Sequence, residues 1–216
     1  MGEEKRGRPK RDFTKTEEAI LLYIARHGAT FYKKLYDVEK VGSKRAVRQA
    51  KDALLKKGLL KVKETKELFT IKPLDLTFTG VLYVLSKIDD DEIAEQIVIK
   101  YKNYPFLDDA AYLLKTDKSA GLWWIKALKR TCSFLKVWKM DQEIINVFLT
   151  IGLLKEASEA PPEIKKNPRI QNFAEIYSIL TALYELAMRK IPIEEKTSKM
   201  SETLLGFFSK FLASQI

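Results

Sequence analysis

The chain has 216 residues, 46% of them hydrophobic, which is enough for one or two folded domains and excludes a wholly disordered protein. Its single cysteine (Cys132) and single histidine (His27) exclude an internal disulfide and a Cys/His zinc site, and argue against a histidine-based catalytic triad. The longest uncharged segments, 76–86 and 144–154, have 11 residues each, whereas a membrane-spanning helix needs about 20. The polar residues 1–6 have no apolar signal-peptide core, so we expect a cytoplasmic, nucleoid-associated protein without membrane contact.

The formal net charge of +10 is confined to one part of the chain. Residues 1–87 contain 21 Lys/Arg and 11 Asp/Glu, whereas residues 88–216 contain 18 of each. A basic segment joined to a neutral one indicates that only the first faces a polyanion. We place the division near residues 86–91 and predict a flexible arm (1–13), a basic domain (14–87) and a helical domain (88–216).

The basic domain begins with a capping box, Thr14-Lys15-Thr16-Glu17, which predicts a helix that ends at Gly28. A second helix is expected from Thr30 to about Glu39, with Phe31, Leu35 and Val38 facing inward. After Gly42, Ser43 can cap a third helix that runs to about Lys57.

The third helix separates into two faces at about 100° per residue. One face is apolar and comprises Ala46, Val47, Ala50, Ala53 and Leu54, and the other is polar and comprises Lys44, Arg45, Arg48, Gln49 and Asp52. Beyond Gly58 the alternation of residues 60–63 and 69–72 predicts a short β-hairpin that ends at Pro73, and a fourth helix follows over 77–87.

This order of elements resembles the winged helix-turn-helix family of DNA-binding regulators, in particular its PadR- and MarR-like archaeal and bacterial branches. The matching residues are Ala50-x-x-x-Leu54-Leu55-Lys56-Lys57-Gly58-Leu59-Leu60, then Phe69-Thr70-Ile71 and Leu76-Thr77-Phe78-Thr79-Gly80. The resemblance covers roughly residues 14–87 and implies a winged helix of three helices, a small β-hairpin and an extra helix. With the all-helical domain that the pattern of residues 88–216 predicts, the expected fold is mainly α.

A helix with Arg and Gln on its polar face can enter the major groove, where Arg pairs with guanine and Gln with adenine. We therefore expect Arg45, Arg48 and Gln49 to contact bases, and flanking cations to contact phosphates. The complete set of expected DNA contacts within this domain is Lys33, Lys34, Ser43, Lys44, Arg45, Arg48, Gln49, Lys61, Lys63 and Lys66. The alternative interpretation is a solvated polar face on a domain that binds proteins.

A basic arm precedes the domain and resembles an AT-hook, with the core Arg6-Gly7-Arg8-Pro9. Gly7 allows the backbone to approach the floor of a narrow minor groove, and Pro9 favours an extended path at Arg8. The cations expected to contact DNA are Arg6, Arg8, Lys10 and Arg11. The alternative is a solvated tail that adds only non-specific attraction.

Residues 88–216 predict about six helices, at 91–101, 105–115, 119–139, 141–156, 172–190 and 196–214, with a proline-marked loop near 158–170. Ile144–Leu154 and Ile176–Met188 are nearly uncharged and are expected to be deeply buried. Asp89-Asp90-Asp91-Glu92 fits a helix cap better than a metal site, and Cys132 fits a buried residue better than a redox sensor. Tryptophans 123, 124 and 138 are assigned to packing rather than to an effector pocket.

The last predicted helix has seven large apolar residues, Met200, Leu204, Leu205, Phe207, Phe208, Phe211 and Leu212, within an arc of about 160°. Such a face packs either within its own domain or in a homodimer. Our leading hypothesis is a transcriptional regulator that binds double-stranded DNA, with no cofactor and no catalytic residues. The alternatives are a non-specific architectural, chromatin or replication-associated DNA-binding protein, and a winged-helix module that binds other proteins.

Overall fold

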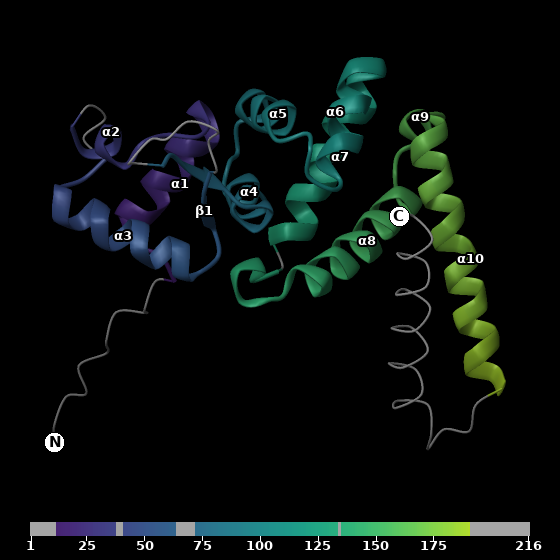
Figure 1. The fold of residues 1–216 in the computed structure, drawn as a ribbon. Helices are drawn as coiled ribbons and strands as arrows, with labels where there is room; N and C mark the ends of the chain where they lie inside the picture. The colour runs from purple at the N-terminus through teal and green to yellow at the C-terminus, as the bar shows by residue number, and fades with distance from the viewer. Residues whose placement is uncertain (1–11, 38–40, 64–71, 134, 191–216) are drawn as a thin grey trace, which may run out of the picture. The chain divides into compact units, whose positions relative to one another are not determined.

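The computed structural model describes residues 12–37, 41–63, 72–133 and 135–190, whose course is shown in Figure 1. Within these residues there are ten α-helices, one short 3-10 helix (η1) and a two-stranded sheet. The elements are α1 (Lys15–His27), α2 (Tyr32–Asp37), α3 (Lys44–Lys56), β1 (Leu60–Val62), β2 (Leu74–Leu76), α4 (Phe78–Leu85), α5 (Asp91–Lys100), α6 (Leu107–Thr116), α7 (Lys118–Ser133), η1 (Val137–Lys139), α8 (Gln142–Ser158), α9 (Pro162–Lys165) and α10 (Pro168–Lys190). The predicted mainly α fold, with three helices, a hairpin, a further helix and then a helical region, is confirmed.

The chain forms two compact units. The first contains the described residues up to Tyr112 together with Cys132–Met140, and the second contains Leu113–Thr131 and the described residues from Asp141 onward. The chain passes from one unit to the other inside α6 and inside α7. The charge boundary near residues 86–91 therefore lies within the first unit.

Helix α1 forms as its capping box predicts. The Thr14 hydroxyl accepts a hydrogen bond from the Glu17 backbone N–H (3.2 Å), and the Glu17 carboxylate accepts one from the Thr14 N–H (2.7 Å). The helix ends at Gly28, whose φ of 84° is in the region that favours glycine. Ile20, Leu21 and Ile24 are fully buried, so this helix supplies much of the core of the first unit.

Helix α2 is shorter than predicted, because Thr30 does not join it. The Thr30 N–H donates to the Leu74 carbonyl (2.9 Å) and the Thr30 carbonyl accepts from the Leu74 N–H (2.8 Å), which extends the sheet. Leu35 is buried as expected, but Phe31 is 43% exposed, so its predicted inward orientation is wrong. Val38 lies outside the described residues.

The hairpin pairs β1 with β2 in antiparallel register, with Leu60 opposite Leu76 and Val62 opposite Leu74. Residues 69–71 of the predicted second strand lie outside the described residues, but Pro73 does not end the pairing, because the strand that pairs with β1 follows it. The Pro73 carbonyl accepts a hydrogen bond from the Lys63 N–H (2.8 Å). Proline has no backbone N–H, so its carbonyl is the one backbone group that it can contribute to strand pairing. Leu74 and Leu76 enter the core, and the predicted turn at 64–67 lies outside the described residues.

Helix α4 lies at the centre of the first unit, and seven of its eight residues are buried. Thr77 caps it by accepting from the Gly80 N–H (3.1 Å), and the same hydroxyl donates to the Gly58 carbonyl (2.6 Å). Gly80 packs against the Leu59 carbonyl so closely that a Cβ there would lie 2.1 Å from the oxygen. The Leu-Thr-x-x-Gly sequence thus joins α4 to the turn that follows α3.

Helix α5 also packs in the first unit, against α1 and α4. Asp90 caps it through hydrogen bonds from the N–H groups of Glu92 (2.9 Å) and Ile93 (3.2 Å), which confirms the predicted cap. At its other end, the Lys100 ammonium donates to the Ala25 and Arg26 carbonyls at the end of α1, and Tyr101 donates to Asp75 (2.9 Å).

The second unit is built largely on α8 and α10, and it corrects three predictions. Ile144 (45%), Phe148 (46%) and Ile151 (37%) are exposed on α8, and Ile179 (59%) and Leu183 (48%) on α10, because among the described residues each helix is covered on one side only. The expected loop at 158–170 contains α9, and Pro168 begins α10, as suits a residue without an N–H. The helix expected to reach residue 139 ends at Ser133.

The tryptophan and cysteine residues of α7 are structural. Trp124 is fully buried and meets Phe173 edge to face, with ring centroids 4.9 Å apart. Cys132 is 2% exposed, and burial raises the pKa of its thiol to about 12. A thiol that resists ionisation is a poor nucleophile, so the packing interpretation is favoured over the redox sensor.

Candidate nucleic-acid interface

Helix α3 presents four of the expected DNA-binding residues on its outward side. Ser43 caps it, its hydroxyl accepting a hydrogen bond from the Ala46 N–H (3.2 Å), and Val47, Ala50 and Leu54 are buried. These apolar residues pack the helix against α1 and α2. Lys44, Arg45, Arg48 and Gln49 are consequently all exposed, on a helix whose position is fixed by the core beneath it.

The polar residues of α3 form two adjacent stripes, because residues three or four apart share a helix face. The first stripe is Lys44, Arg48 and Lys51, and the second is Arg45, Gln49 and Asp52. At about 100° per residue, Arg45 and Arg48 lie about 60° apart around the helix axis. The two arginines therefore point in different directions from the same helix.

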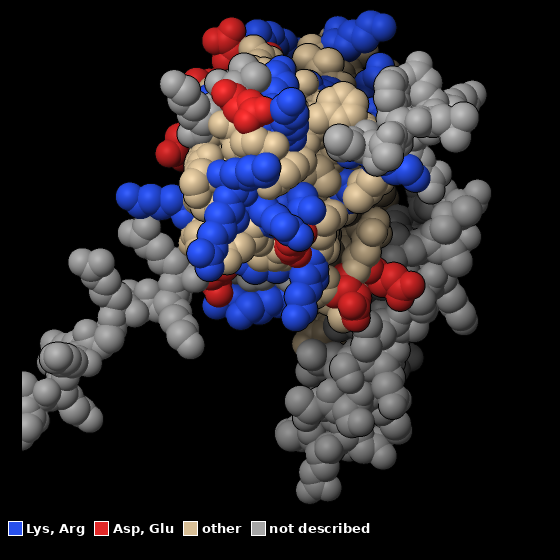
Figure 2. Space-filling view, turned by 60° about the vertical axis from the view of Figure 1, so that its left-hand side comes forward, with Lys and Arg blue, Asp and Glu red and all other residues tan. Residues whose placement is uncertain are grey.

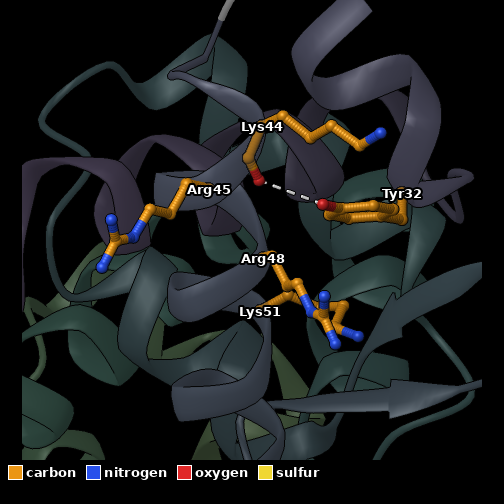
Figure 3. Close-up of a pocket in the computed structure, with 5 residues that line it drawn as sticks. All are labelled: Tyr32, Lys44, Arg45, Arg48 and Lys51. Atoms are coloured by element: carbon orange, nitrogen blue, oxygen red, sulfur yellow. Dashed lines mark hydrogen bonds between the residues drawn. The ribbon is translucent and has the colours of Figure 1, made fainter.

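An open pocket of about 490 Å³ lies between α2 and the first stripe, and we call it the basic pocket. It is lined by Tyr32, Lys44, Arg45, Arg48 and Lys51 (Figure 3). In Figure 3 the Lys44 side chain extends above the Tyr32 ring and those of Arg48 and Lys51 extend below it, whereas the guanidinium of Arg45 is directed away from the other four residues.

Tyr32 holds the two helices of the basic pocket together. Its hydroxyl donates a hydrogen bond to the Lys44 carbonyl (3.0 Å), in the first turn of α3. The Lys51 ammonium lies over the Tyr32 ring at 5.4 Å from its centroid, and Lys44 lies over the Tyr36 ring at 5.8 Å. These cation–π contacts orient the ammonium groups without neutralising them.

The charge of this surface is strongly positive (Figure 2). Among the described residues, neither Arg45 nor Arg48 has an ion-pair partner. Lys51 pairs with Asp52 at 2.9 Å, and on α2 Lys33 pairs with Asp37 at 3.9 Å. Such exposed pairs are weak, so an incoming polyanion can replace their carboxylates.

The other expected contacts are distributed around this surface. Lys33 and Lys34 are exposed on α2, and Lys61 and Lys63 are exposed at β1. The Lys61 ammonium lies 5.2 Å from the centroid of the Tyr104 ring. Lys66 and the arm residues Arg6, Arg8, Lys10 and Arg11 lie outside the described residues.

The structure thus brings together Lys44, Arg45 and Arg48, and adds two residues that sequence reasoning missed. Lys51 continues the Lys44–Arg48 stripe at helical spacing, a signal that the sequence carries. Tyr32 enters the basic pocket only because α2 packs beside α3, which no local pattern reveals.

The start of the domain is attached to the C-terminal end of α3. The Lys57 ammonium donates to the Asp12 carbonyl (3.0 Å) and to the Glu17 carboxylate (2.8 Å), and lies 4.1 Å from the centroid of the Phe13 ring. Burial alone would raise the pKa of Glu17, but hydrogen bonds from Lys57 and Thr14 outweigh it, and the pKa is lowered. Asp12, the first described residue, therefore lies beside the C-terminal end of α3.

Comparison with known proteins leaves the family open: no protein-family model matches the chain, and neither a curated protein nor a solved structure matches it. The resemblance to winged helix-turn-helix regulators stays a prediction. Within the described ranges, no helix is long and apolar enough to span a bilayer. In the same part of the chain, no group of three His, Cys, Asp or Glu side chains is placed to hold a metal ion.

Proposed function

We propose that this protein is a transcriptional regulator that binds duplex DNA by inserting α3 into the major groove. The observation that carries the proposal is the exposed face of α3, on which Arg45 and Arg48 have no ion-pair partner among the described residues. A partner that supplies both hydrogen-bond acceptors and negative charge can pair with these two guanidinium groups, which are held on a firmly packed helix.

Duplex DNA is the polyanion that matches this geometry. The major groove is wide enough to admit one α-helix, and Arg and Gln are the side chains that pair in bidentate fashion with guanine and adenine. The cations of α2 and β1 flank α3 in sequence and supply phosphate contacts, which account for most of the hydrogen bonds in protein–DNA complexes. The basic arm adds further cations before residue 12.

The test is the affinity of the Arg45→Ala/Arg48→Ala double variant for the best duplex selected from a random library. If both arginines contact DNA, each substitution should cost about 1–3 kcal/mol, or roughly 5- to 150-fold in Kd at constant salt. Lys102→Ala/Lys115→Ala removes the same charge from exposed residues outside α3 and is the matched control. Equal affinities for the two double variants would contradict the placement of α3 in the groove.

Sequence preference separates a regulator from an architectural protein. A regulator should bind its selected duplex about 1000-fold or more tightly than unrelated duplexes at the same salt concentration. A ratio near one would favour the architectural interpretation, and no binding to any duplex at low salt would favour a domain that binds proteins.

A further inference from the structure

We propose that the basic pocket between α2 and α3 binds a single phosphodiester group of the DNA backbone, and that Arg48 belongs to this phosphate site rather than to the bases. This inference rests on the proposed function and assigns a separate task to each stripe of α3. It reverses the expectation from sequence, in which Arg48 contacts a base and flanking cations contact the phosphates.

The first support is the direction of the cations. Lys44, Arg48 and Lys51 share one stripe beside α2 and line the pocket, and the Lys51 ammonium lies over the Tyr32 ring. Several ammonium and guanidinium side chains that line one open pocket suit an anion with several acceptor oxygens, which is the chemistry of a phosphate group. A base edge is planar and needs donors and acceptors aligned in one plane.

The second support is the way in which the pocket is held open. Tyr32 of α2 donates to the Lys44 carbonyl, and Lys51 lies over the Tyr32 ring, so α2 is tied to α3 at two points beside the pocket. The volume of about 490 Å³ is open to one side, as a site for one group of a continuous backbone must be. No acidic side chain lines the pocket.

The third support is the direction of the Arg45 guanidinium at the edge of the pocket. Its guanidinium is directed away from the other four residues, on the stripe that includes Gln49 (Figure 3). Phosphate contacts fix the register of a protein on the duplex, and base contacts supply the specificity. The pocket therefore positions α3, and the Arg45–Gln49 stripe is left to contact bases.

The decisive experiment combines protein variants with duplexes in which single phosphates are replaced by neutral methylphosphonates. The duplex is the best one that wild type selects from a random library. One backbone position should weaken wild-type binding about tenfold when neutralised, but should leave Arg48→Ala unaffected, because that variant has already lost the contact. Lys102→Ala, which removes one exposed cation outside the pocket, should respond to the replacement as wild type does.

A second readout distinguishes phosphate from base contacts. Arg48→Ala and Lys51→Ala should each weaken binding by the same factor on preferred and unrelated duplexes, and lower the slope of log K against log salt by about 1. Arg45→Ala should instead reduce the ratio between the two duplexes. If Arg48→Ala changes that ratio as Arg45→Ala does, or no methylphosphonate position couples to Arg48, the phosphate assignment is overturned while DNA binding stands.

A free phosphate ion has the same charged oxygens as a backbone phosphodiester. A titration with inorganic phosphate tests whether the basic pocket binds the free ion instead. Saturation at millimolar phosphate, followed by the NMR signals of the Tyr32 ring, together with no coupling to any DNA phosphate, would overturn the backbone assignment. If wild type binds no duplex at low salt, the proposed function and this inference fail together. Coupling at one backbone position, without saturation by free phosphate, is the expected result.

Discussion

Replacing Lys57 with methionine tests how the start of the domain is attached to α3. Methionine keeps an unbranched apolar side chain over Phe13 but removes the ammonium group that donates to Glu17 (2.8 Å) and to the Asp12 carbonyl (3.0 Å). The Glu17 side chain is only 5% exposed, so the variant leaves a buried carboxylate with the Thr14 N–H as its remaining donor.

The expected cost of Lys57→Met is about 2 kcal/mol in the free energy of unfolding. Removing one partner of a fully buried pair costs about 3–5 kcal/mol, and the 30% exposure of the Lys57 side chain reduces that figure because water reaches the pair. Lys56→Met is the matched control, since Lys56 is the exposed neighbour on the same turn. Substitutions at exposed positions usually change stability by less than about 0.5 kcal/mol.

The pH dependence gives an independent check with a definite sign. The folded-state pKa of Glu17 is lowered from its ordinary value of 4.5, so its stabilising contribution is present above pH 4.5 and is lost as the pH falls through the folded value. Without Lys57, burial raises the pKa of Glu17. The difference in stability between Lys57→Met and wild type should therefore shrink as the pH is lowered from 7 to 4.

Urea unfolding followed by circular dichroism at pH 7 and pH 4 measures both effects. Glu17→Gln combined with Lys57→Met should cost less than the sum of the two single substitutions, because the double variant buries no unpaired charge. A cost for Lys57→Met no larger than that of Lys56→Met, or one that does not depend on pH, would refute the role of this pair.

Three further outcomes are expected. Gly80→Ala should destabilise the protein by about 2 kcal/mol, because the new Cβ would lie 2.1 Å from the Leu59 carbonyl oxygen. Gly58→Ala has open space around the new Cβ but a φ of 68°, and should cost only about 1 kcal/mol. Chemical denaturation measures both costs, and equal values would show that the close contact at Gly80 is unimportant. Cys132 should react with a thiol reagent no faster than the protein unfolds, and rapid modification of the native protein would contradict its burial. Deleting residues 1–11 should lower both the salt slope and any preference for A·T-rich duplexes; binding unchanged by the deletion would reduce the arm to a solvated tail.

The candidate site was predictable from sequence only as far as local spacing reaches. Helical spacing at about 100° per residue places Lys44, Arg45, Arg48 and Gln49 on the polar side of α3, and all four are exposed in the structure. Helical spacing within α3 does not show which of its cations lie next to side chains of another helix. The sequence therefore does not identify Tyr32 as part of the site, although helical spacing already separates Arg45 from Arg48 by about 60°.

The errors in the fold have one common physical cause, which is competition between local preference and distant partners. The sequence pattern places Thr30 at the start of the second helix, but in the structure its backbone N–H and C=O pair with those of Leu74. Pro73 interrupts the sequence pattern as a strand breaker should, yet the strand that pairs with β1 begins just after it. Ile144–Leu154 is apolar all round, but among the described residues it is covered on one side only.

By itself, the sequence determined which segments are helical and where the charge is concentrated. Caps at Thr14, Ser43 and Thr77 and the helix end at Gly28 act through hydrogen bonds and backbone angles within a few residues, so they could be recognised without any tertiary information. The tertiary structure alone decided the strand register, the extent of the first unit and the residues that face one another across the basic pocket. Those features depend on contacts between segments that lie far apart in the chain, whose free energies no local pattern contains.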